Sequence, residues 1–165
     1  MRKRCRKAGV CRGSVLVESA LATLPILALL FGVFDVAFAI FAKNTMRFAV
    51  RQGVRYAVTS QTIPGLGHDA SIKTAVQTYS LGLAEAMSPD HNAMNRISIQ
   101  YYDPITLAEV TGVNSNAGGN IVVVKASGLS WAWMIPLLRS TTPLQFSVAS
   151  ADIMEASPSG GPPGR

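Results

Sequence analysis

The stretch that decides the fold is SALATLPILALLFGVF, which occupies residues 19–34. It contains no charged residue, and its apolar character continues through Asp35 to Ala42. A helix of about 24 residues rises roughly 36 Å, enough to cross the ~30 Å hydrocarbon core of a bilayer with some tilt. The alternative is a buried core helix, but a chain of 165 residues could hardly surround so continuous an apolar run. The sequence therefore predicts one membrane-spanning helix near the N-terminus.

Positive charge is concentrated immediately before this helix. The formal net charge is +6, and the basic residues that account for it all precede Gly13: Arg2, Lys3, Arg4, Arg6, Lys7 and Arg12. Beyond Gly13, Lys and Arg are balanced by Asp and Glu. Because no basic stripe follows the body of the chain, nucleic acid is not an expected partner. The basic flank predicts that the N-terminus stays in the cytosol.

Candidate catalytic and metal-binding residues are sparse. Cys5 and Cys11 both lie in the basic leader, residues 1–13, and their spacing matches no zinc pattern. His68 and His91 each stand beside an Asp in turn-like surroundings, where solvated side chains are commoner than a metal site or a catalytic pair. The sequence contains no phosphate-binding glycine loop and no nucleophile elbow. We therefore expect no enzyme activity, no metal, no cofactor and no small-molecule substrate.

The junction between leader and helix, RGSVLVE at residues 12–18, carries the most specific pattern. Gly13 is small enough to let an enzyme approach the backbone closely. Glu18 places a carboxylate at the edge of an apolar helix, where its charge costs free energy unless it is paired. Solvation by lipid head groups is the simpler interpretation of Glu18, and pairing with a neighbouring subunit is the functional one.

This order of basic leader, Gly, four residues, Glu and long apolar helix resembles the processing site of type IV pilin-like precursors. Pro25 early in the span, Asp35 late in it, and AVRQGVRYA at residues 49–57 resemble the TadE-type pseudopilins of tight-adherence (Tad, or Flp) pilus systems. The similarity is specific over about residues 13–57 and much weaker beyond them. Ser19 stands where the major pilins of this system usually carry an aromatic residue, which favours a minor pseudopilin or pilus assembly component.

The resemblance implies cleavage between Gly13 and Ser14 by a membrane-embedded prepilin peptidase. It further implies partners among other Tad pilus subunits, and a location in the bacterial inner (cytoplasmic) membrane or in the pilus, with the C-terminal domain periplasmic or otherwise extracytoplasmic. Helix–helix or assembly contacts are assigned to Glu18, Pro25, Asp35, Arg51, Gly53 and Arg55.

Two alternatives stay open. The chain can be a single-span, membrane-anchored binding or sensory module that retains its leader. It can also be a secreted domain released after Ala39, because residues 37–39 resemble a small-residue cleavage site. Against the second alternative, the apolar run is longer than the usual signal-peptide core of about 7–15 residues.

The remainder of the sequence predicts an α+β class. The membrane helix and its extension cover residues 14–60, and a small extracytoplasmic domain covers residues 61–157. Helical spacing predicts a second helix over residues 71–87. Period-two or β-branched patterns over residues 96–103, 120–126 and 144–153 predict a short antiparallel sheet.

Two segments remain. The apolar segment from Trp131 to Leu138 is too short to span a bilayer, and it is expected in the core or at a subunit contact rather than at the membrane surface. Residues 158–165 form a Gly/Pro tail that we expect to be disordered.

Overall fold

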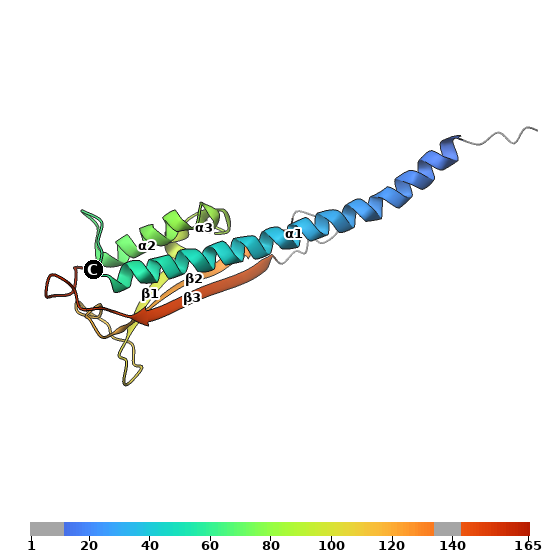
Figure 1. The fold of residues 1–165 in the computed structure, drawn as a ribbon. Helices are drawn as coiled ribbons and strands as arrows, with labels where there is room; N and C mark the ends of the chain where they lie inside the picture. Colours follow the sequence, from blue (N-terminus) through green and yellow to red (C-terminus); the bar gives the residue numbers. More distant parts are fainter. Residues whose placement is uncertain (1–11, 134–142) are drawn as a thin grey trace, which may run out of the picture.

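One helix dominates the structure, a computed structural model that describes residues 12–133 and 143–165, without the side chains of residues 12–14. Helix α1 runs from Arg12 to Val58. Its 47 residues rise about 70 Å. Pro25 lies inside α1 without ending it. In Figure 1 the N-terminal half of α1 projects away from the rest of the molecule, and the C-terminal half carries a small domain.

The other elements all belong to this domain. They are α2 (His68–Tyr79), α3 (Leu83–Ala86), the 3-10 helix η1 (Ala93–Arg96), β1 (Ile97–Tyr102), β2 (Ile121–Trp131) and β3 (Leu144–Ile153). The strands form one antiparallel sheet in the order β1-β2-β3. The predicted α+β class, with a long N-terminal helix and a short antiparallel sheet, is confirmed.

The central strand explains why the sheet forms. Val122, Val124 and Ala126 alternate along β2 and are fully buried, while Lys125 between them is exposed. This period of two is typical of a strand with one face on the core. β2 continues beyond the predicted run at Ala126, through an irregularity before Leu129, and ends at Trp131.

Helix α1 lies between α2 on one side and strands β2 and β3 on the other (Figure 1). Its buried positions recur every three or four residues, which places them along one side of the helix: Ala39, Ala42, Met46, Ala49, Val50, Val54 and Ala57. The second half of α1 is therefore part of the domain core. The predicted boundary at residue 60 separates two segments that pack together.

The prediction of a single helix over residues 71–87 is wrong. Helix α2 ends at Tyr79, and Leu81 and Gly82 follow with φ of 55° and 78°. These left-handed conformations cannot continue a right-handed helix. The chain turns there and begins α3 at Leu83.

The end of the chain also differs from expectation. Residues 163–165 make hydrogen bonds to the domain near the start of α2, where the composition predicts a disordered tail. Of the apolar segment, Trp131 lies at the end of β2 and is partly buried. Residues 134–138 lie outside the described residues.

Candidate functional site

The exposed half of α1 has the length of a bilayer. From Val15 to Phe34 no residue is buried, and the first buried residue is Asp35. This stretch rises about 30 Å, close to the thickness of the hydrocarbon core. Among the described residues, α1 is the one helix that is long and apolar enough to cross a membrane. The domain therefore begins to cover the helix where a bilayer-spanning segment would end.

The predicted processing site lies at the start of this segment. The bond between Gly13 and Ser14 lies close to Arg12, where the described part of α1 begins, and backbone N–H groups in the first turn of a helix have no partner within it. Such a turn unwinds more easily than the helix interior. Glu18 follows one turn later, exposed, and Pro25 is exposed further along the same segment.

Asp35, which we assigned to assembly contacts, has its side chain turned into the subunit. It is 1% exposed, and its Oδ1 accepts a hydrogen bond from Trp131 Nε1 over 3.1 Å. A buried carboxylate is costly unless it is hydrogen-bonded. The contact thus connects the end of β2 to α1 at the edge of the exposed half.

Gly53 is likewise used inside the subunit. A Cβ at this position would lie 2.3 Å from Val76 Cγ2, so the glycine permits the close approach of α1 and α2. By contrast, Arg51 and Arg55 are exposed, as is Arg47 on the same helix face, and these side chains are accessible to acidic partners. The assembly roles of all these residues stay predictions.

A partly buried polar cluster lies at the far end of the domain, and the sequence did not predict it. The Tyr101 hydroxyl donates to Asp69 Oδ1 over 2.8 Å and lies 3.3 Å from His68 Nδ1. The Asn116 amide Nδ2 also lies 3.3 Å from His68 Nδ1. The Arg165 guanidinium donates to Asp69 Oδ2 through Nη2 at 2.6 Å and Nε at 2.9 Å.

The charge states in this cluster follow from its burial and from its hydrogen bonds. Burial lowers the pKa of His68, although the nearby Asp69 carboxylate opposes this effect. Burial and the hydrogen bond to Asp69 raise the pKa of Tyr101, and the hydrogen bond to Asp69 raises the pKa of Arg165. At neutral pH the cluster holds a neutral imidazole, a neutral phenol and an ion pair. None of these groups is activated as a nucleophile.

No local signal in the sequence could have revealed this cluster. Asp69 and Arg165 are 96 positions apart, and His68 and Tyr101 are 33 apart. Gly67, His68 and Asp69 instead suggested a turn, whereas His68 begins α2 and is fully buried.

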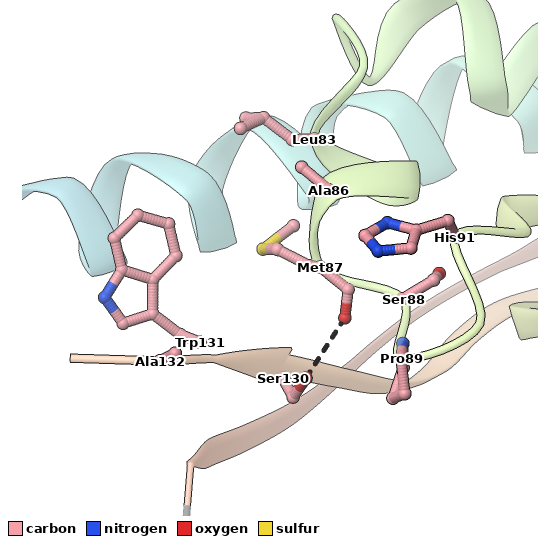
Figure 2. A pocket seen from close by; sticks show the side chains of 9 residues that line it. All are labelled: Leu83, Ala86, Met87, Ser88, Pro89, His91, Ser130, Trp131 and Ala132. Carbon is pink, nitrogen blue, oxygen red and sulfur yellow. Dashed lines mark hydrogen bonds between the residues drawn. The ribbon is translucent and has the colours of Figure 1, made fainter. Parts of the chain in front are cut away.

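A hollow of about 330 Å³ lies between α3 and the end of β2, and Figure 2 shows the side chains that line it. Leu83, Met87 and Trp131 give it an apolar lining, and Ser130 N–H donates to the Met87 carbonyl over 2.9 Å. Among the described residues that line it, His91 has the one titratable side chain. Within residues 12–133 and 143–165, no group of three or more His, Cys, Asp or Glu could hold a metal ion.

A helix that exposes its apolar first half and carries a small α+β domain on its second half defines a class of small α+β proteins with a candidate membrane-anchoring helix. The family model described as TadE-like protein matches residues 13–55, and over this segment the chain is similar to TadE-like proteins. The family is one of Tad pilus-associated components. No curated protein and no solved structure matches the chain. The match begins at the predicted cleavage residue and includes all the assigned assembly residues, while most of the domain lies outside it.

Proposed function

We propose that this chain is a minor pseudopilin of a Tad-type (Flp) pilus, cleaved after Gly13 by a prepilin peptidase and assembled through α1. The observation that carries the proposal is the uncovered apolar segment from Val15 to Phe34, with Glu18 near its start, inside the TadE-like match. An apolar surface of this length needs lipid or other apolar helices around it. In the membrane lipid supplies that cover, and in a pilus the α1 helices of neighbouring subunits supply it.

The basic leader sets the direction of insertion. Its charges hold the N-terminus in the cytosol, so the domain lies on the extracytoplasmic side of the membrane. The Gly13–Ser14 bond is then at the cytosolic interface, within reach of a membrane-embedded peptidase.

Cleavage creates a partner for Glu18. The new amine at Ser14 lies four residues before Glu18, so the two groups share one face of α1 about 6 Å apart along the axis. A neighbouring helix shifted by a small number of residues can place its amine beside this carboxylate. Such pairing compensates the free-energy cost of a charge in the apolar part of α1. It also fixes how far one subunit is shifted along the helix axis relative to the next.

Mass spectrometry of the membrane-extracted protein tests the proposal. We expect an N-terminus at Ser14 in the wild type and an intact leader in Gly13→Leu. Gly9→Leu is the matched control, because it alters another leader glycine and should leave cleavage normal. An intact leader in the wild type would support the anchored binding or sensory module, and a start at Ile40 would support the secreted domain.

A further inference from the structure

The last three residues of the chain occupy a site between the start of α2, β1 and the loop at residues 112–116. The His68 N–H donates to the Gly164 carbonyl over 2.7 Å, and Asn116 Nδ2 donates to the Pro163 carbonyl over 2.8 Å. These two hydrogen bonds hold the backbone of residues 163–165, which we call the tail. The Arg165 side chain forms an ion pair with Asp69.

The site selects arginine by its geometry. Two guanidinium nitrogens bind Asp69, while Nη1 donates to Ser115 Oγ over 2.6 Å and to the Gly112 carbonyl over 3.2 Å. The guanidinium carbon lies 5.0 Å from the centre of the Tyr101 ring. A planar fork satisfies all these contacts at once, whereas the ammonium group of lysine cannot. The side chain also gains a cation–π contact with the ring.

The surroundings are built for a ligand. Tyr101, Ser115 and Asn116 are each 1% exposed, and His68 is fully buried. Burying polar side chains is costly unless they find partners, yet Asn116 Oδ1 has no hydrogen-bond partner among the described residues. Gly67 leaves space for the tail, because a Cβ there would lie 2.5 Å from the Arg165 carbonyl carbon.

The segment that connects this tail to β3 makes fewer hydrogen bonds with the domain than the tail itself. Residues 158–160 are exposed, and the hydrogen bonds of residues 157–161 run within that segment: Gly160 to Ser157, Ser157 to Ser159 and Ser159 to Gly161. The tail is therefore held at its end, and residues 157–161 before it make no hydrogen bond to the domain among the described residues.

We propose that Asp69, Tyr101, Ser115 and Asn116 form a binding site for a Pro-Gly-Arg segment, which takes residues 163–165 of its own chain or of a second copy. Residues 158–165, when extended, span up to about 28 Å, comparable to the diameter of a domain of this size. A tail can thus reach the site of a copy in contact with it. In an isolated subunit the short tether favours the chain's own tail, and close packing of copies makes exchange competitive. The proposal requires neither leader cleavage nor a pilus.

Binding of the tail as a separate peptide tests the site. The protein is the full-length Arg165→Ala chain in detergent micelles, whose site lacks its own guanidinium, and the probe is a fluorescent SPSGGPPGR peptide followed by anisotropy. We expect saturable binding that is at least roughly tenfold weaker for the same peptide carrying Arg165→Lys. Because both peptides meet the same protein, a folding defect cannot produce the difference. Equal binding of the two peptides, or no binding of either, would overturn the site.

Mixing two variants tests the second copy as the source of the tail. Arg165→Ala retains the site and lacks the arginine, whereas Asp69→Asn retains the arginine and lacks its carboxylate partner. Energy transfer between labelled copies should rise in the mixture above either variant alone, and unlabelled SPSGGPPGR should reverse the increase. Transfer in the mixture no higher than in either variant alone would overturn exchange between copies.

Discussion

Trp131 Nε1 donates a hydrogen bond to Asp35 Oδ1 over 3.1 Å, joining residues 96 positions apart. From Val15 onward, Asp35 is the first buried residue of α1, so the bond lies where the exposed half of the helix meets the domain. It explains how a carboxylate is tolerated at the end of an apolar segment, and it ties the central strand of the sheet to the helix that carries it.

Replacing Trp131 by Phe should therefore loosen the domain from α1. The substitution keeps an aromatic ring but removes the N–H that reaches Asp35, and depriving a buried carboxylate of a donor costs about 1–3 kcal/mol. Denaturant unfolding in micelles, followed by circular dichroism, measures the loss. Trp133→Phe is the matched control from the same segment and should change stability by less. Equal losses in the two variants would show that the hydrogen bond contributes little.

Gly53→Ala should destabilise the contact between α1 and α2. The added methyl group would lie 2.3 Å from Val76 Cγ2, and overpacking of this kind costs about 1–3 kcal/mol. Val76→Ala should restore part of the loss when combined with it, because the two positions share one contact. Gly161→Ala, where an added Cβ meets nothing within 4 Å, should be close to neutral. Denaturant unfolding in micelles measures the stability of each variant. If the stability losses of Gly53→Ala and Val76→Ala simply add in the double variant, the packing explanation is contradicted.

The parts of the fold that could be predicted from the sequence are those whose residues show a pattern within one short segment. The apolar run at residues 19–34 and the strand at residues 144–153 each carry their own periodicity or composition, and the structure has a helix and a strand there. The break after α2 was missed because Leu81 gives no hint of its left-handed conformation, φ 55°. A single Gly82 lowers the helix propensity of the segment but does not by itself show that the helix ends there.

The contacts that the sequence could not reveal join distant positions. A carboxylate near the end of an apolar helix suggests a partner outside the subunit, but Asp35 finds a donor at Trp131 through the fold of the sheet. In the same way, Gly and Pro in the tail suggest disorder, and the composition cannot show that Arg165 meets Asp69. Both cases need the tertiary structure, because pairing over long separations leaves no periodicity.

Stability of the tail site should fall in acid. Burial lowers the pKa of His68, so between its folded pKa and its ordinary value of about 6.5 the unfolded chain binds more protons than the native one. The free energy of unfolding therefore decreases as the pH falls through this window. The titratable groups near the His68 imidazole are Asp69, Arg165 and Tyr101. Of these, the Asp69 carboxylate opposes the lowering of the His68 pKa.

Denaturant midpoints at pH 7.5 and pH 5 test this dependence. His68→Gln should reduce the difference between the two midpoints, because it removes the group whose protonation changes. His91→Gln alters an exposed histidine and should leave the difference unchanged. An equal pH dependence in His68→Gln and in the wild type would assign the effect to other groups.

Cysteine labelling should report both processing and orientation. Both cysteines of the chain lie before Gly13, so the mature protein should not react with a maleimide even after denaturation, whereas Gly13→Leu should. A cysteine introduced by Ile105→Cys, at a side chain that is 90% exposed, should be labelled in intact spheroplasts by a membrane-impermeant maleimide. The leader cysteines of Gly13→Leu should be labelled only after lysis. The reverse accessibility would place the domain in the cytosol.

Glu18→Ala should separate processing from assembly. Removing the carboxylate makes the exposed segment more apolar, so insertion and cleavage after Gly13 should proceed, and the N-terminus should still be Ser14. The variant loses the group that we expect to pair with the amine of a neighbouring subunit, so copurification with other pilus subunits and the number of pili should fall severalfold.

Glu18→Gln should behave similarly, because an amide keeps the shape but not the charge. Glu155→Ala removes an exposed acid outside the helix and should leave both readouts unchanged. Normal pili with Glu18→Ala would mean that lipid head groups solvate this carboxylate, and the position of one subunit against the next would then have to be set by the apolar surface of α1 alone.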